Sequence, residues 1–282
     1  MISIKRLSTE KRARITECLV EGTSLQTTAR MTAAARETVE KLLADLGSAC
    51  SEYQDQVMRE LPCRRVRVEE MWTFARTRKG HLPCDGHDER EDVWTWVALD
   101  ADAKLVPAWL IGQRTSEDAI YFVQGLAARL AHRVQLTTDG RNAFLYGVDE
   151  AVGSGIDYAR LIELYGATRG ENEERHGMAR SLGREVRRIT GDPDPGHISA
   201  GHVERQSLTM RMGMRSMTRL SNALSTRVEN LAATVSLHFM HYNFARLLDT
   251  LARPSSRTPA MAAGIADHVW SLDEIAGLLD SN

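Results

Sequence analysis

The sequence predicts an α/β protein in which a small all-helical unit precedes a mixed β-sheet flanked by helices. Apolar residues alternate along 65–75, which is the period of a half-buried strand, and 93–99 is expected to form a second strand. Apolar residues recur at three- and four-residue steps along 116–130, which is the period of an amphipathic helix. The chain has 282 residues, 43% of them hydrophobic, enough for one large domain and a small accessory domain.

The N-terminal residues have the pattern of three short helices. Ser8 can cap a first helix over 9–21, and a second helix is expected over 25–30. After a tight turn, a third helix is expected over 33–46, ended by Gly47. We therefore expect a first domain over residues 1–47.

Two short helices joined by a tight turn are typical of a helix-turn-helix, whose last helix enters the major groove of DNA. Arg36, Thr38 and Lys41 would face outward on that helix and are the predicted DNA contacts. The turn lacks the usual glycine, and a plain three-helix core without DNA contacts is the alternative.

A β-rich domain is expected over 64–253, after a polar helical linker at 48–63. Its predicted elements are strands over 65–75, 93–99 and 105–111, a helix over 116–130, and a strand over 134–137. After the helical crossover, the fourth strand can lie parallel to the first. The order β-β-β-α-β is how a ribonuclease H-like core begins.

The remainder of the chain is less regular. We expect an insertion around 148–198 that interrupts the core, although 156–165 could form another strand. A long helical region follows, with an apolar stripe from Val203 to Val235 typical of a core or helix-partner surface. A C-terminal tail over 254–282 contains a last amphipathic helix near 271–279.

Three acidic residues fall where a ribonuclease H-like nuclease needs them. Glu69 lies within the first strand, Asp139 follows the fourth, and Glu204 lies on a later helix. Carboxylates so placed can hold two divalent cations, Mg²⁺ or Mn²⁺, which activate the attacking oxygen and stabilise the leaving oxygen in phosphodiester chemistry. For Asp139, an ordinary turn aspartate is the alternative.

Glu204 is in line with arginines on its predicted helix. Arg211, Arg215 and Arg219 fall along the same stripe and are predicted to hold DNA phosphates beside the metal site. A solvated basic helix face is the alternative.

Several stretches resemble the DDE transposases of the insertion-sequence-one family. They are 68–74, 92–96, 136–140 and 203–211, together with the N-terminal helices, 238–244 and 258–264. The resemblance covers nearly the whole chain. It implies a transposase whose Asp/Asp/Glu site uses magnesium to nick transposon ends and join the freed 3′-hydroxyls to target DNA. Its partners would be the terminal inverted repeats, target DNA and further copies of the chain, because two ends must be brought together.

The chain departs from that family at the first acid. The family pattern is Asp-Glu-x-Trp, whereas this sequence has Glu69-Glu70-Met71-Trp72. The extra methylene moves the carboxylate by about 1 Å, which can cost on the order of 10²-fold in rate. Glu70 points to the opposite face of the strand and cannot substitute. A DNA-binding protein that has lost catalysis is therefore one alternative, and a regulator that senses a small ligand in an apolar pocket is another.

The net charge of −2 conceals an uneven distribution. Residues 1–80 carry 15 Lys and Arg against 11 Asp and Glu, residues 81–174 carry 8 against 17, and residues 175–257 carry 13 against 6. Basic blocks that flank an acidic one are typical of a protein that binds nucleic acid. Ordinary variation of charge along a chain is the alternative.

Other patterns concern location and metals. The chain contains no run of 18 apolar residues and starts without the apolar run of a signal peptide, so we expect no membrane span. Its four cysteines have no disulfide-like spacing, which suits the cytoplasm. His81, Cys84 and His87, with Cys63 upstream, could bind zinc, but their spacing is not that of a known finger and favours a hairpin loop.

Overall fold

The computed structural model describes residues 7–77, 90–139, 142–165, 181–198, 228–252 and 256–280. The helices are α1 (Thr9–Val20), α2 (Leu25–Thr32), α3 (Arg36–Val57), α4 (Ser116–Ala127), α5 (Asn142–Val152), α7 (Val228–Met240), α8 (Pro259–Ala262) and α9 (Leu272–Gly277). The strands are β1 (Arg65–Thr77), β2 (Arg90–Asp100), β3 (Ala108–Gly112), β4 (Gln135–Asp139), β5 (Asp157–Tyr165) and β6 (Ser181–Thr190).

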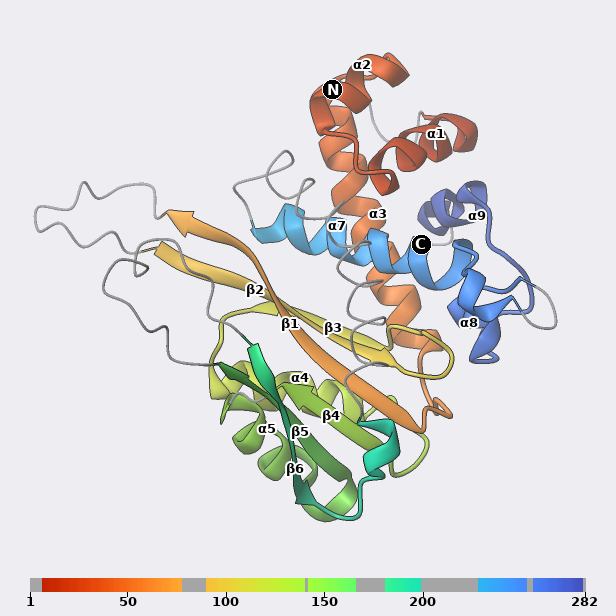
Figure 1. Cartoon of the computed structure of the whole chain (residues 1–282). Coiled ribbons are helices and arrows are strands. Elements are labelled where there is room, and N and C mark those ends of the chain that lie inside the picture. Colours follow the sequence, from red (N-terminus) through yellow and green to blue (C-terminus); the bar gives the residue numbers. More distant parts are fainter. Residues whose placement is uncertain are drawn as a thin grey trace, which may run out of the picture.

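The strands form one mixed sheet in the order β3-β2-β1-β4-β5-β6. The first three strands are antiparallel neighbours, whereas β1, β4 and β5 run parallel. The expected order β-β-β-α-β and the parallel pairing of the fourth strand with the first are confirmed. An α/β fold with a mixed sheet between helices is thus present, and its strand order fits a ribonuclease H-like core (Figure 1).

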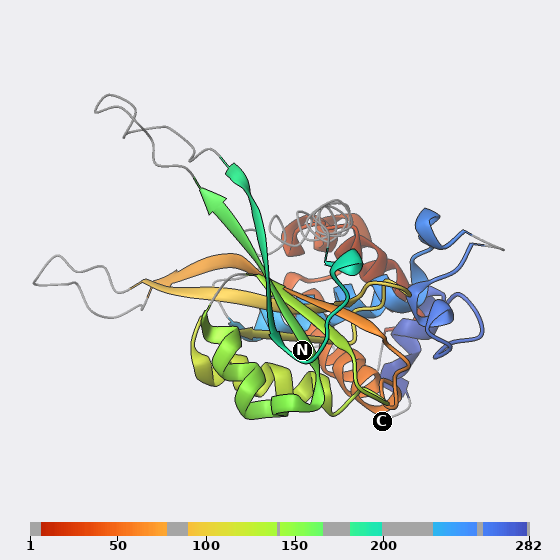
Figure 2. The same ribbon diagram turned by 60° about the horizontal axis from the view of Figure 1, so that its bottom comes forward.

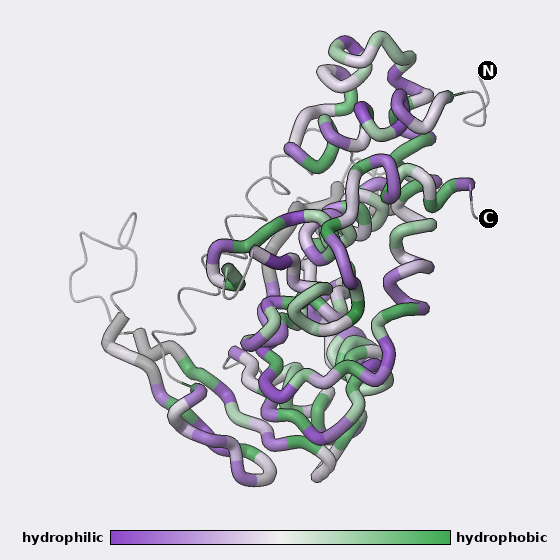
Figure 3. The backbone as a smooth tube through the Cα atoms, turned by 90° about the vertical axis from the view of Figure 1, so that its right-hand side faces the viewer, coloured by the Kyte–Doolittle hydropathy of each residue, from purple (hydrophilic) through white to green (hydrophobic). Residues whose placement is uncertain are grey.

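The two faces of the sheet are covered by different helices. On one face, Trp96 of β2 packs against Phe122 of α4 and Phe144 of α5. On the other face, Val97 of β2 clusters with α7, through Val235 among others. The rotated view shows α4 and α5 on one side of the sheet and the α3–α7 pair on the other (Figure 2). Figure 3 colours the described backbone by hydropathy and shows hydrophobic (green) stretches among hydrophilic (purple) ones.

The segment 148–198, expected to interrupt the core, instead supplies part of it. Strand β5 was foreseen, and it pairs parallel with β4. Helix α5, which crosses from β4 to β5, and strand β6, which pairs antiparallel with β5, were not expected from the sequence. The sheet therefore has two strands beyond the four assigned to the core.

Helix α3 is longer than expected, because Gly47 does not end it. The helix continues to Val57 and packs alongside α7. A Cβ at Gly47 would lie 2.5 Å from the Cα of Ala233 on α7, so the glycine allows the two backbones to approach closely. The Ser236 hydroxyl donates to the Gly47 carbonyl oxygen at 2.8 Å, which joins the two helices at this point.

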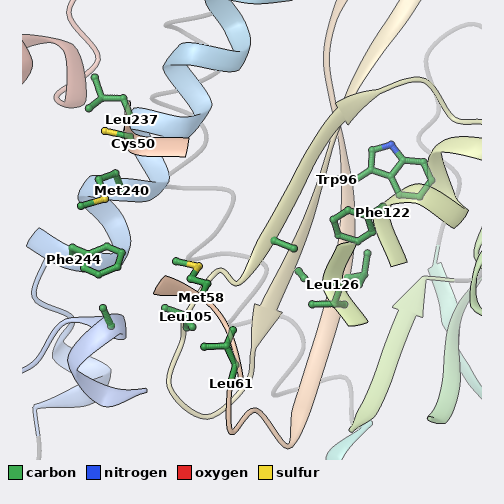
Figure 4. Close-up of a cluster of buried hydrophobic side chains, with 14 of the residues drawn as sticks. Cys50, Met58, Leu61, Trp96, Leu105, Phe122, Leu126, Leu237, Met240 and Phe244 are labelled. Atoms are coloured by element: carbon green, nitrogen blue, oxygen red, sulfur yellow. The ribbon is translucent and has the colours of Figure 1, made fainter. Parts of the chain in front are cut away.

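The core is continuous from the α3–α7 pair to the sheet. Figure 4 shows Cys50 of α3 beside Leu237 of α7, and Trp96 near Phe122 on the sheet side. Below α3, the side chains of Met58, Leu61 and Leu105 are buried between these two groups (Figure 4).

Local capping explains the N-terminal and C-terminal helices. The Ser8 hydroxyl accepts a hydrogen bond from the first turn of α1, as expected, and the Ser24 hydroxyl does the same for α2. Ser271 forms a capping box with Glu274 at the start of α9. Helix α9 packs on α1, where Arg12 forms a 2.6 Å ion pair with Asp280. The C-terminal residues therefore pack against α1 and stabilise its position.

No helix within the described ranges is long and apolar enough to cross a membrane.

The contact at Gly47 can be tested with an alanine. We expect Gly47→Ala to lower the free energy of unfolding by about 1–3 kcal/mol, because the new methyl overlaps the Ala233 backbone. Urea unfolding followed by circular dichroism measures the change. Gly125→Ala on α4 is the matched control, since no atom lies within 4 Å of its Cβ position; it should stabilise by up to about 1 kcal/mol. Equal effects at the two positions would contradict close packing at Gly47.

Candidate active site

Glu69 and Asp139 lie on neighbouring parallel strands. The β1–β4 pairing matches Arg65 with Gln135 and Arg67 with Thr137. The paired residues end there, and Glu69 and Asp139 each follow two residues later on their strands. The first two predicted acids therefore lie just beyond the end of the same parallel ladder.

The two carboxylates also share a face. Partners in a parallel register point to the same side, and residues two apart on a strand do so as well. Glu69 and Asp139 therefore lie on the face that carries Val97, which α7 covers. Helices α4 and α5 cover the other face.

Glu70 lies on the opposite face, as the strand period predicted. Its side chain is fully buried and forms a 2.5 Å ion pair with Arg114. The Arg114 guanidinium lies 3.2 Å from the centre of the Trp94 ring, a cation–π contact. Glu70 is thus part of the packing between the sheet and its α4 side.

Glu69 has a basic neighbour on its own strand. The guanidinium of Arg67 lies 2.9 Å from a carboxylate oxygen of Glu69. The Glu69 side chain is 9% exposed and that of Arg67 is 16% exposed, so the pair is largely shielded from water. The sequence already carried a signal for this pair, since residues two apart on a strand point to the same side.

The end of β4 is held by its buried neighbours. The hydroxyls of Thr138 and Tyr158 lie 2.9 Å apart, and the Thr138 hydroxyl also donates to the carbonyl oxygen of Asp139. Burial raises the pKa of Tyr158 to about 12, so this residue stays a neutral phenol. The Asp139 backbone is therefore fixed at the point where its side chain leaves the strand.

The third predicted acid, Glu204, and the predicted phosphate contacts Arg211, Arg215 and Arg219 lie outside the described residues. Both ends of that gap are described, however. Before it, buried Ile198 clusters with Ala159 and Leu161 of β5. These two residues pair with Thr137 and Asp139, so Ile198 lies on the same face as Asp139. After the gap, α7 covers this face too.

Among the described residues, no group of three or more His, Cys, Asp or Glu side chains could hold a metal ion. The zinc candidates His81, Cys84 and His87 lie outside the described residues. Their upstream partner Cys63 is buried near Asp100, and burial raises the pKa of its thiol to about 12, which opposes the thiolate that zinc requires.

The predicted DNA contacts lie at the start of α3. Arg36 and Lys41 are exposed and Thr38 is half-buried. Lys41 also forms a 2.7 Å ion pair with Asp45 on the same helix. Arg36 is therefore accessible to a partner. Lys41 would have to leave the Asp45 carboxylate to bind a DNA phosphate.

A surface hollow lies beside β3. Its volume is 210 Å³, and its lining includes Trp109, Tyr121 and the ion-paired Asp55 and Arg129. Pockets for small organic ligands are typically about 300 Å³ or larger and mostly apolar. This hollow gives no support to a ligand-sensing regulator.

Comparison with known proteins gives little further information. No family model and no curated protein sequence matches the chain. The structure is similar to the Mos1 transposase paired-end complex with left transposon end at 12% identity, covering 54% of this chain and 59% of that one, with a TM-score of 0.24. It is similar to the piggyBac transposase synaptic complex with hairpin DNA at 10% identity, covering 100% of this chain and 72% of that one, with a TM-score of 0.40.

The Mos1 strand transfer complex is similar at 11% identity, covering 77% of this chain and 76% of that one, with a TM-score of 0.25. In the first of these three comparisons the chain spans 59% of the other protein's length. Similarities at these TM-scores are too low to support an assignment, so the insertion-sequence-one resemblance stays a prediction.

The buried ion pair behind the candidate site predicts a stability effect. Glu70→Gln should lower the free energy of unfolding by about 3 kcal/mol, because it leaves the Arg114 charge without its carboxylate. Denaturant unfolding measures the change. Asp45→Asn, which breaks the exposed Lys41 pair, is the control and should cost less than about 1 kcal/mol. If Glu70→Gln were equally mild, the buried pair would have no structural role.

Proposed function

We propose that the chain is a DDE-type transposase that cleaves DNA at transposon ends and joins the ends to target DNA with divalent metal ions. The observation that supports the proposal is that Glu69 and Asp139 lie on the neighbouring parallel strands β1 and β4 and on the same face of the sheet, two residues beyond the paired Arg67 and Thr137. This is the arrangement that the catalytic acids of a ribonuclease H-like nuclease require.

The residues present fit a divalent metal. Glu69 and Asp139 offer carboxylate oxygens, the hard donors that suit Mg²⁺ and Mn²⁺. Glu204 would be the third carboxylate ligand. It comes six residues after Ile198, which lies on the same face of the sheet as Asp139. When bound, a pair of such ions activates an attacking oxygen and stabilises a leaving oxygen in phosphodiester chemistry.

The chain's own residues would hold and orient the DNA. Arg36, Thr38 and Lys41 of α3 would contact the terminal repeat, as in a helix-turn-helix. Arg211, Arg215 and Arg219 would hold phosphates close to the acids. Because two transposon ends must meet, we infer a homodimer or larger homo-oligomer.

A second function is favoured by a specific observation. The first acid is Glu69 instead of aspartate, and it is already paired with Arg67. A transposase-derived protein that binds DNA without cutting it is therefore the competing proposal.

Cleavage of terminal-repeat DNA separates the two proposals. With Mg²⁺ or Mn²⁺, the wild-type protein should nick duplexes that carry the repeats flanking its gene. Asp139→Asn should reduce the cleavage rate by at least about 10²-fold, because a neutral amide is a poor metal ligand. The variant should bind the same DNA normally in a gel-shift assay, which excludes misfolding. Equal cleavage by both proteins would remove Asp139 from the site.

The length of the first acid can be tested directly. Glu69→Asp restores the family pattern and should raise the cleavage rate, by up to on the order of 10²-fold if the extra methylene misplaces the carboxylate. Single-turnover rates at saturating Mn²⁺ measure the change. If neither the wild type nor Glu69→Asp cuts the DNA, the non-catalytic function is the correct one.

DNA binding by α3 has its own test. Arg36→Ala should weaken binding to the terminal repeat on the order of tenfold and reduce discrimination against unrelated DNA. Fluorescence anisotropy at several salt concentrations measures both effects. Arg14→Ala, which removes the same charge from an exposed position on α1, is the control. Equal losses for the two variants would indicate a general charge effect and contradict recognition by α3.

A further inference from the structure

Arg67 is placed to control the candidate metal site. It precedes Glu69 by two residues on β1 and points to the same face, where its guanidinium lies 2.9 Å from the Glu69 carboxylate. Thr137 of β4 is its partner in the parallel register. Arg67 and Thr137 thus come two residues before Glu69 and Asp139 on their strands.

The ion pair depends on long side chains. Residues two apart on a strand are separated by about 6.6 Å along the backbone. An arginine and a glutamate together can span this distance, whereas an aspartate is one methylene shorter. The glutamate at position 69 therefore reaches one methylene further toward Arg67 than an aspartate would.

The same carboxylate cannot serve both cations at full strength. A divalent ion on Glu69 would place two more positive charges close to a guanidinium, in surroundings where water screens charge poorly. Although the carboxylate has two oxygens, this repulsion means that each cation weakens the binding of the other.

We propose that Arg67 is a built-in counter-ion that competes with the divalent metal for Glu69. This inference rests on the proposed function, because it takes Glu69 as a metal ligand. In the metal-free protein Arg67 neutralises a carboxylate that is almost fully buried. Metal binding displaces the guanidinium, and this step weakens the affinity of the site for metal.

The test is Mn²⁺ binding to the full-length protein without DNA, measured by isothermal titration calorimetry and by the loss of the free Mn²⁺ electron paramagnetic resonance signal. Arg67→Met keeps the apolar stem and removes the charge, and it should tighten Mn²⁺ binding at least about fivefold. Arg67→Lys keeps the charge and should stay near the wild type.

Arg65→Met is the matched control. Arg65 lies on the same strand and face, two residues earlier, but it pairs with Asp102. Its loss removes an equal charge from the region without releasing Glu69, so the Mn²⁺ affinity should be unchanged. Circular dichroism checks the fold of each variant. Should Arg67→Met unfold, Arg67→Gln takes its place with the same expected result.

The outcomes separate the inference from the proposed function. Wild-type Mn²⁺ binding that Asp139→Asn abolishes supports the metal site. If Arg67→Met then binds Mn²⁺ with unchanged or weaker affinity, competition by Arg67 is refuted while the metal site stands. If no variant binds Mn²⁺, Glu69→Asp and Arg67→Met included, the proposed function fails and the competition fails with it.

Discussion

The candidate site depends on the short parallel pairing of β1 with β4. Only Arg65–Arg67 and Gln135–Thr137 form this ladder, yet it fixes which side chains share a face. A slip of one residue would bring Asp139 level with Glu70, whose side chain points to the other face. The register is held by burial, because Val66 and Leu136 face the α4 side and are almost fully inaccessible to water. Core packing on one face therefore sets the position of the acids on the other.

One continuous helix, α3, connects the N-terminal helices to the domain that contains the sheet. Helix α3 has 22 residues, a length of about 33 Å. Its first part carries Arg36, and its later part packs on α7, where buried Gln54 donates to the carbonyl oxygen of Ser236. Asn243, also buried, lies in the short helical segment His241–Ala245 that follows α7. Its side chain hydrogen-bonds to the backbone N–H and carbonyl oxygen of Val106, just before β3. These contacts give the start of α3 a defined orientation toward the sheet.

Much of this fold could be predicted from the sequence, because its signals are local. The Ser8 cap, the alternation along β1 and the helical pattern of the crossover to β4 can each be recognised in one stretch of neighbouring residues. The prediction that Gly47 ends its helix is wrong, because the role of this glycine depends on a contact with Ala233, far along the chain. Likewise, strand β6 is polar and arginine-rich, and only its pairing with β5 shows that it belongs to the sheet. Of the site, the neighbouring parallel strands that carry Glu69 and Asp139 could be predicted from the order of elements, whereas Arg114, the distant partner of Glu70, could not.

The glutamate at position 69 changes two properties at once. It moves the carboxylate away from the strand, and it brings the carboxylate within reach of Arg67 on the same face. The charge of a nearly buried carboxylate must be balanced in either case, by an arginine of the chain or by a metal ion. Under the proposed function, metal binding and the ion pair with Arg67 therefore place opposite demands on this one position.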